Sequence, residues 1–491
     1  MMNWNMIIRA LSVQGAVVSA SMIFPTLLAF HDGSHDFYPF LSCFLISLCA
    51  CGAVLFMTYR KMSRNETADA RIGVSDACVI VTFTWIVASV IGAMPMLLSK
   101  AVPTFTDAFF EAMSGFTTTG ANMVTKPELA PRGVLLWRSL THWLGGLGII
   151  VTSLAILPLV GISGIELYKA ESPSPTPEKM TPRLHKTALY LWEIYAALTF
   201  IEAALLCFFG MTPFEAVTYS FSTLATGGFA VHYNSIAHYA SPAIEWVIIV
   251  FMFLAGVNFT LHFLLLKDGP SAYWKDDEFR VFAFIVAFIA VVCAVTLLRC
   301  GIETSWLTSL RHSLFQTLTL ITTTGFGVSD TAPWPMGLKF LLLMAMFIGG
   351  CAGSTGGGIK VLRCIMVWKS MGNSLEKVLH PRRLVYVWIN GKPQKSDVIA
   401  TVLAFFAQYM ILTAITTGMM CAFGYDMLSA LSGALSCLSN VGQGLGEFCT
   451  SGSGYAVIPD LGKWVLAAAM LIGRLELTTV LALLLPSMWR R

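Results

Sequence analysis

The chain has 491 residues, of which 56% are hydrophobic, 12% aromatic and 12% charged, and its net charge is +4 at pH 7. Soluble domains carry about 25% charged residues and disordered chains are poor in aromatic residues, so both classes are excluded. The small net charge gives no case for nucleic acid as a partner, and the fold class we expect is an all-α integral membrane protein.

Apolar runs long enough to cross a bilayer, which takes about 20 residues, recur ten times along the chain. They cover residues 7–30, 37–59, 76–99, 133–160, 187–210, 242–267, 279–300, 335–368, 398–424 and 461–486. Four shorter apolar stretches, at 105–116, 213–224, 307–321 and 426–438, begin near Pro, Thr, Ser or Asp and end at glycine-rich polar runs. We therefore expect ten transmembrane helices and four re-entrant half-helices.

Lysine and arginine gather in alternate connections. The connections after the second span, at 161–186, at 267–280 and above all at 359–395 are basic, whereas 31–36 and 228–241 carry no Lys or Arg. Because basic loops stay on the cytoplasmic side, we expect both termini in the cytoplasm and the four half-helices on the outer side.

A related run follows each half-helix. The runs are Phe116–Ala121, Leu224–Phe229, Ile321–Phe326 and Ser439–Gly444, and the glycines we align are Gly120, Gly227, Gly325 and Gly442. A unit of helix, half-helix, glycine turn and helix thus occurs four times after two N-terminal helices. The boundaries that we predict are 1–71 for the N-terminal helices and 72–182, 183–274, 275–394 and 395–491 for the repeats.

Irregular backbone at membrane depth is tolerated only where it is buried in protein or lines a water-filled cavity. Four such runs on one side of the membrane satisfy this together around one central pore, where carbonyl oxygens can replace the hydration shell of a cation. Glycine suits the turn because it accepts positive φ angles. The filter residues that we predict are Thr118, Thr119, Gly120, Ala225, Thr226, Gly227, Thr323, Thr324, Gly325, Asn440, Val441 and Gly442.

The eighth apolar run is interrupted by small residues. As one straight helix, residues 335–370 would be about 54 Å long, whereas the hydrocarbon core is about 30 Å thick. A phosphate-binding loop is disfavoured because neither its G-x-x-x-x-G-K-[ST] pattern nor a preceding strand is present, and helix packing explains only one or two such glycines. We expect a flexible loop under the filter, formed by Gly349, Gly350, Gly353, Ser354, Thr355, Gly356, Gly357 and Gly358.

Arg474 lies in the middle of the last apolar run. A charge there is costly unless it faces a cavity or a partner, and Glu476 is not a simple helical partner because residues two apart point in different directions. Two interpretations stay open, a structural ion pair with an acid elsewhere and a positive barrier in the pore below the filter.

Other polar residues in or near the spans have simpler structural interpretations. We interpret Asn258, His142, His262 and Glu202 as packing groups, and Glu111, Glu215 and Asp107 as caps of the half-helices or a negative field at the outer mouth.

These motifs resemble the Trk/Ktr/HKT superfamily of potassium transporters, and most closely its bacterial Trk-type membrane subunit. The resemblance covers nearly the whole chain and rests on the four filter runs, on Trp143–Ile150, Gly349–Lys360 and Gly473–Glu476, and on the two extra N-terminal spans. It implies K⁺ uptake across the bacterial inner membrane, with K⁺ at the filter residues and no organic cofactor on this chain. It also implies a gate in the 349–358 run and a pore barrier at Arg474.

The partners that the resemblance implies are a second copy in a homodimer, a cytosolic ring of a regulatory nucleotide-binding (NAD/ATP-type) subunit, and membrane lipids. A proton- or sodium-coupled symporter is the alternative, although the sequence offers no clear Asp, Glu or His relay near the midplane. An enzyme is not expected, because neither D-x-x-D nor H-E-x-x-H occurs.

Overall fold

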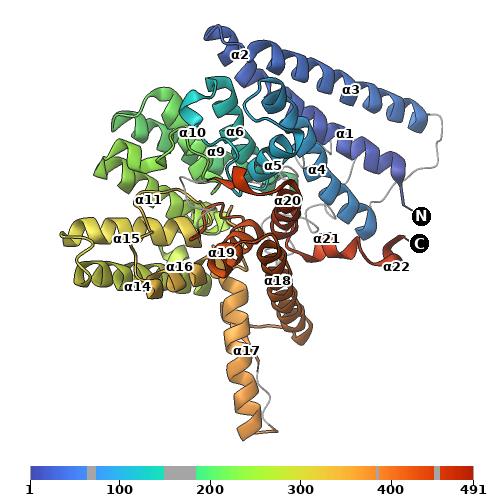
Figure 1. Ribbon diagram of the computed structural model, residues 1–491. Helices are drawn as coiled ribbons and strands as arrows, with labels where there is room; N and C mark the ends of the chain where they lie inside the picture. The colour runs from blue at the N-terminus through green and yellow to red at the C-terminus, as the bar shows by residue number, and fades with distance from the viewer. Residues whose placement is uncertain are drawn as a thin grey trace.

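The computed structural model describes residues 2–63, 73–146, 148, 184–382, 386–446 and 454–489. This part of the chain is almost entirely helical, and its only sheet is the antiparallel hairpin of β1 (Trp388–Ile389) and β2 (Lys392–Pro393). Figure 1 shows the helices gathered into one body, from which α17 (Val361–Leu379) projects downward.

The N-terminal helices form an outer layer. α1 (Trp4–Ser21), α2 (Ile23–His31) and α3 (Phe37–Ser63) pack together along one side of the body, and α1 also packs against α4 (Val74–Leu98). α3 has many exposed apolar side chains, including Ile46 at 70% and Met57 at 67% exposure, as expected for a helix that faces lipid.

Four segments that we call repeats follow, each with a long first helix, a half-helix and a second helix. The first helices are α4, α9 (Leu184–Phe208), α14 (Asp277–Arg299) and α18 (Ser396–Ala422). The half-helices are α5 (Phe105–Phe116), α10 (Pro213–Leu224), α15 (Trp306–Ile321) and α19 (Met427–Leu438), each within one residue of the stretch expected from the sequence. The second helices are α6 (Arg132–Gly146), α11 (Pro242–Gly256), α16 (Met336–Ile348) and α20 (Asp460–Arg474).

The remaining short helices lie in the connections between these elements. They are η1 (Pro127–Leu129), η3 (Ser235–Tyr239), α12 (Phe259–Asp268), α13 (Ser271–Lys275), η4 (Tyr455–Val457), α21 (Thr478–Ala482) and α22 (Pro486–Trp489).

Local capping sets where the half-helices begin. Thr104 Oγ1 accepts a hydrogen bond of 3.2 Å from the Asp107 N–H, and Asp426 accepts bonds of 3.1 Å from Leu428 and Ser429. Thr212 and Glu215 form a capping box at the start of α10. Such caps satisfy N–H groups that have no partner inside the helix.

Three of the second helices, α11, α16 and α20, are shorter than the apolar runs that contain them. Among the described residues, six helices are long and apolar enough to cross a membrane, and α11 with α12 makes a seventh span bent by 95°. The run 242–267 is therefore not one straight helix: Val257 is extended, and Asn258 caps α12 by accepting a 2.8 Å bond from the Thr260 N–H. The runs 335–368 and 461–486 also break, after Ile348 and Arg474, whereas residues 149–160 of the run 133–160 lie outside the described residues. The chain is a multi-pass membrane protein, but the count of ten spans stays a prediction.

Buried ion pairs join neighbouring repeats. Lys463 of α20 contacts Asp107 of α5 at 2.6 Å, and Arg311 of α15 contacts Glu245 of α11 at 2.6 Å. Removing one partner of a buried pair costs about 3–5 kcal/mol because the other charge is left uncompensated. These pairs therefore hold the fourth repeat to the first and the second to the third.

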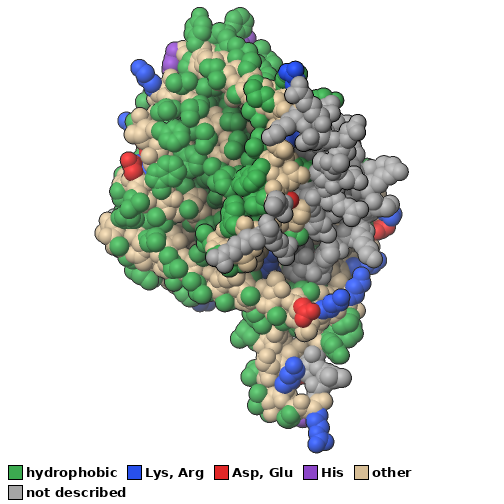
Figure 2. Space-filling view, turned by 90° about the vertical axis from the view of Figure 1, so that its right-hand side faces the viewer, with side chains coloured by type: hydrophobic (Ala, Val, Ile, Leu, Met, Phe, Trp, Pro, Cys, Tyr) green, Lys and Arg blue, Asp and Glu red, His purple; other side chains and the backbone are tan. Residues whose placement is uncertain are grey.

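In the part of this face that Figure 2 colours by residue type, hydrophobic side chains dominate the body, and Lys and Arg lie on the lower projection. That projection contains α17, which carries Lys369 and Lys377.

Candidate functional site

The four segments that follow the half-helices share one backbone conformation. A residue other than glycine has a positive φ in each, and a glycine with positive φ follows two residues later. The pairs are Thr118 (52°) and Gly120 (76°), Thr226 (53°) and Gly228 (83°), Thr323 (62°) and Gly325 (82°), and Asn440 (58°) and Gly442 (77°). We call residues 117–120, 225–228, 322–325 and 439–442 the glycine segments.

The residue between each pair makes the same hydrogen bond. The N–H groups of Thr119, Gly227, Thr324 and Val441 each donate 2.8 Å bonds to the carbonyl oxygen five residues earlier, on Ser114, Ser222, Thr319 and Ser436. The half-helix thus fixes its own glycine segment at an identical point in all four repeats.

The register of the second repeat differs from the one expected from the sequence. Its backbone aligns Gly228, not Gly227, with the other three glycines, so that Thr226, Gly227 and Gly228 correspond to Thr323, Thr324 and Gly325. Ala225 falls one position earlier in the segment. The sequence leaves the alignment of the second repeat ambiguous because Gly227 and Gly228 are adjacent. The backbone torsion angles select Gly228.

The four glycines form a closed ring. A Cβ atom placed on any of these glycines would lie within 3.0 Å of a carbonyl oxygen in another repeat. Gly120 faces the Gly227 oxygen, Gly228 the Thr324 oxygen, Gly325 the Val441 oxygen and Gly442 the Thr119 oxygen. Each repeat therefore touches the next, and the fourth touches the first. Both the positive φ and the neighbouring carbonyl require glycine at these positions.

Side chains behind the ring bond to one another. The Oγ1 atoms of Thr117 and Thr119 are 2.8 Å apart, as are those of Thr322 and Thr324. Asn440 Nδ2 donates to Thr119 Oγ1 at 3.0 Å, which links the fourth segment to the first. These buried contacts stiffen the wall of the ring.

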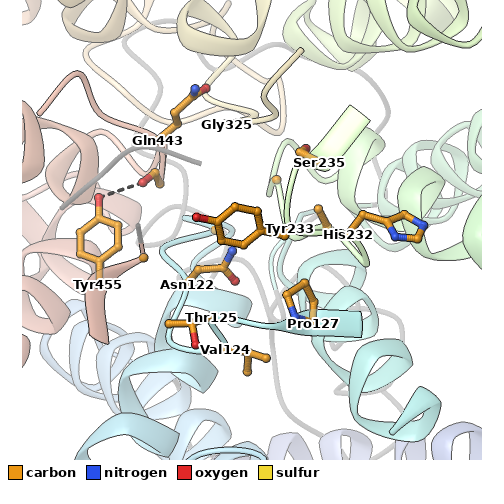
Figure 3. A pocket seen from close by; sticks show the side chains of 15 residues that line it. Asn122, Val124, Thr125, Pro127, His232, Tyr233, Ser235, Gly325, Gln443 and Tyr455 are labelled. Atoms are coloured by element: carbon orange, nitrogen blue, oxygen red, sulfur yellow. Dashed lines mark hydrogen bonds between the residues drawn. The ribbon is translucent and has the colours of Figure 1, made fainter. Parts of the chain in front are cut away.

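One cavity opens on the ring from the side of the long loops. It is lined by all four ring glycines and by polar side chains that include Asn122, His232, Gln443 and Tyr455. In Figure 3 Tyr455 and His232 lie on opposite sides of this cavity. The Tyr455 hydroxyl donates a 2.8 Å bond to the Gly442 carbonyl oxygen, so the cavity wall supports the ring directly.

The acidic residues of the half-helices are paired rather than free. Glu111 Oε1 accepts a 2.6 Å bond from Arg138 Nε, and Glu111 Oε2 accepts one of 2.6 Å from the Met123 N–H. Arg138 also donates to the Ala230 carbonyl oxygen at 3.3 Å, so this one arginine connects the first two repeats. The sequence alone did not single out Arg138, although a lone arginine inside an apolar run was the available signal.

Glu215 caps the start of α10, which is one of the two roles expected for it from the sequence. Its Oε2 accepts a 3.1 Å bond from the Thr212 N–H, and its Oε1 lies 2.9 Å from His232 Nε2. Partial burial raises the pKa of the Glu215 carboxyl, but the hydrogen bonds from His232 and Thr212 outweigh it and hold that pKa below its ordinary value.

The loop between α16 and α17, residues 349–360, lies against the other end of the glycine segments. The Gly357 N–H donates a 2.7 Å bond to Thr323 Oγ1. A Cβ atom on Gly357 would lie within 3.0 Å of the Ser439 carbonyl oxygen, and one on Gly356 would lie 2.8 Å from that of Thr322. The break predicted from the glycine content is therefore present, and it contacts the third and fourth segments.

Arg474 reaches both the ring and the loop. Its guanidinium donates to Thr118 Oγ1 at 3.0 Å, to the Thr355 carbonyl oxygen at 2.8 Å, and to the carbonyl oxygens of Gly145 and Gly146 at 2.6 and 2.9 Å. Glu476 pairs instead with Arg363, whose guanidinium lies 4.2 Å from the Phe405 ring centroid. Lys360, which the sequence placed among the basic residues of the 359–395 connection, is buried and donates to the Gly356 carbonyl oxygen.

The comparisons with known proteins agree over the full chain. Residues 44–489 match the family described as "TrkH: Cation transport protein". The chain is 39% identical over 496 residues to the Trk system potassium uptake protein TrkH of Vibrio parahaemolyticus, and 36% identical over 494 residues to that of Escherichia coli K12, with 100% of both chains covered in each case. The crystal structure of the potassium transporter TrkH from Vibrio parahaemolyticus matches with a TM-score of 0.88 and 37% identity over 100% of both chains. The chain therefore belongs to the TrkH family of cation transport proteins, which are transporters and not enzymes.

Proposed function

We propose that this protein takes up K⁺ through a pore whose filter is the glycine ring. The observation that carries the proposal is the closed circle of glycine and carbonyl contacts that joins all four repeats. Backbone carbonyls arranged around one opening replace the hydration shell of a cation, and the relatives named above are potassium uptake proteins.

The filter residues that follow from the backbone register are Thr118, Thr119 and Gly120, Thr226, Gly227 and Gly228, Thr323, Thr324 and Gly325, and Asn440, Val441 and Gly442. The 349–360 loop is the gate, because Gly356 and Gly357 pack against carbonyl oxygens at the base of the filter. Arg474 holds that loop and sets a positive barrier beside it.

The orientation and partners belong to the same proposal. Because basic loops favour the cytoplasmic side, we infer that α17, both termini and the other basic loops lie in the cytoplasm of a bacterium, with the filter mouth outside its inner membrane. The working assembly is a homodimer in the lipid membrane. A cytosolic nucleotide-binding subunit that docks near α17 controls it.

Flux of K⁺ into proteoliposomes, with and without an imposed pH or Na⁺ gradient, tests this function. We expect K⁺ entry driven by the K⁺ gradient and membrane potential alone, and a strong loss of it in Gly325→Ala, where the added methyl group meets the Val441 carbonyl oxygen. Uptake that requires a proton or Na⁺ gradient favours the coupled symporter instead.

A further inference from the structure

A histidine lies directly behind the glycine segment of the second repeat. His142 of α6 is fully buried, and its ring occupies the place that a side chain on Gly227 would take, since a Cβ atom there would lie 2.7 Å from His142 Cε1. The ring also stacks on Phe229, with 4.1 Å between centroids and 18° between planes. Its Nδ1 atom is 3.3 Å from Ser222 Oγ.

The other three repeats fill this place differently. At the position of Gly227 they carry Thr119, Thr324 and Val441, all buried, and both threonines bond to a threonine two residues earlier. The second repeat has Ala225 and Gly227 at those two positions, so it lacks both hydroxyl groups and the side chain at the second.

The second helices show the complementary change. The runs Met252–Gly256, Met346–Gly350 and Met470–Arg474 align with His142–Gly146, and fully buried Met252, Met346 and Met470 stand where α6 has His142. Among the four second helices, the one with a histidine at this position therefore packs against the one glycine segment that has no side chain at the position of Gly227. Packed interiors leave little empty space, so the rigid imidazole ring of His142 fills the place left by the missing side chain on Gly227.

The backbone of the second segment nevertheless matches the others. Gly227 keeps the 2.8 Å bond to the Ser222 carbonyl oxygen, and its own carbonyl oxygen takes its place in the ring against Gly120. Glycine is the residue with the greatest conformational freedom, so contacts outside the segment must restrain it. His142 contacts the segment itself and touches Ser222 before it and Phe229 after it.

We propose that His142 is a positioning residue for ion selectivity, which holds the filter segment of the second repeat in register in place of a side chain on Gly227. The sequence predicts only a packing role for His142. The structure makes that role specific, since the ring packs against the glycine segment of the second repeat. The inference rests on the proposed function, because it assumes that the glycine ring is the selectivity filter.

The experiment is a rescue series in which the K⁺/Na⁺ permeability ratio of reconstituted protein is measured. Gly227 has no positive φ, so steric overlap alone excludes a side chain there and removal of the ring makes room for one. We expect His142→Ala and Gly227→Val each to lower the ratio at least about tenfold, the effect of about 1.4 kcal/mol of lost discrimination. The double variant His142→Ala/Gly227→Val is expected to recover most of the wild-type ratio.

The matched control is Met252→Ala combined with Gly227→Val, which removes the corresponding side chain of α11 and is expected not to rescue. A second double variant, His142→Met/Gly227→Val, recreates the residue types of the other repeats and serves if the alanine variants do not fold. An unchanged ratio in His142→Ala, or double variants no better than Gly227→Val, overturns the role of His142. Wild-type protein that does not discriminate K⁺ from Na⁺ overturns the proposed function itself.

Discussion

Arg474 donates a 2.8 Å hydrogen bond to the carbonyl oxygen of Thr355, which joins the end of α20 to the middle of the 349–360 loop. The same Nη1 atom bonds to Thr118 Oγ1 at 3.0 Å. One guanidinium therefore holds the loop against the glycine segment of the first repeat, so the residue that we propose as a barrier is also a structural contact.

Arg474→Ala is expected to raise K⁺ flux per folded molecule by about tenfold or more. A unit charge about 6 Å from a permeating ion, at an effective dielectric constant of about 20, repels it by roughly 2.8 kcal/mol, and the substitution also frees the loop. The measurement is K⁺ flux normalised to protein recovered as a single peak in gel filtration.

Arg311→Ala is the matched control for this variant, because it removes a partly buried cation whose ion pair is with Glu245 and not with the 349–360 loop. We expect it to lower the melting temperature without faster flux. If Arg474→Ala is likewise less stable but conducts K⁺ no faster than the wild type, Arg474 is not a barrier to permeation.

Gly120→Ser is expected to reduce the K⁺/Na⁺ permeability ratio by about tenfold or more, because the added atoms meet the Gly227 carbonyl oxygen. Gly228→Ser is expected to do the same through the Thr324 oxygen. Reversal potentials in mixed K⁺ and Na⁺ solutions give the ratio. If either serine variant selects K⁺ as the wild type does, the ring has been assigned to the wrong residues.

Deletion of residues 352–357 is expected to leave a folded protein with raised, unregulated K⁺ flux, because these residues include the contacts of the loop with the filter. Gly357→Ala is a milder version, since its Cβ atom displaces the loop from the Ser439 oxygen. Gly372→Ala in α17, where no atom lies within 4 Å, is the control and is expected to behave as the wild type. Folded deletion protein with unchanged or abolished flux contradicts a gate at this loop.

Reversal of Arg382 and Arg383 to Glu is expected to weaken co-purification with the cytosolic nucleotide-binding subunit and to blunt the nucleotide response. Arg382 is exposed beyond the end of α17, and Arg383 lies outside the described residues. Lys100→Glu, at an exposed basic residue just after α4, controls for charge alone. Normal assembly of the double variant, together with altered flux only in vesicles rich in anionic lipid, assigns these charges to the membrane surface.

The Glu215 carboxylate is expected to stabilise the protein only above its ordinary pKa. Its folded-state pKa is lowered from the model-peptide value of 4.5, so the contribution is complete above pH 4.5 and is lost as the pH falls through the folded value. Glu215→Gln, which keeps the shape but not the charge, should cost about 1 kcal/mol at pH 7. Thermal unfolding in detergent at pH 7 and at a series of pH values below 4.5 measures this, and a deficit that does not shrink at the lowest pH is the contrary result.

Much of this architecture follows from the sequence because its signals are local. The half-helices are flanked by Thr104, Thr212 or Asp426 on one side and by glycine runs on the other, and these residues act through capping bonds and backbone torsions within a few positions. The break before Gly349 is visible for the same reason. The kink at Asn258 was missed because a single asparagine in a long apolar run carries no distinct signal.

The site was less accessible to sequence reasoning where contacts cross between repeats. The choice of Gly228 over Gly227 depends on torsions that two adjacent glycines leave open. Arg138 and Lys463 pair with acids on other helices, and no spacing along the chain identifies such partners. The compensation between His142 and Gly227 likewise exists only across the junction of two repeats.

The length of α17 gives the loop a mechanical advantage. The helix is pinned at its start, where the Val361 and Leu362 N–H groups donate 3.0 Å bonds to the Gly350 carbonyl oxygen and Glu278 Oε1, and it runs about 27 Å to its free end. A tilt of about 10° swings that end by roughly 5 Å, while the residues beside the pivot move far less. In the assembly that we propose, the helix therefore acts as a lever: a movement of several ångströms at its far end becomes a much smaller displacement of the loop beside the glycine segments.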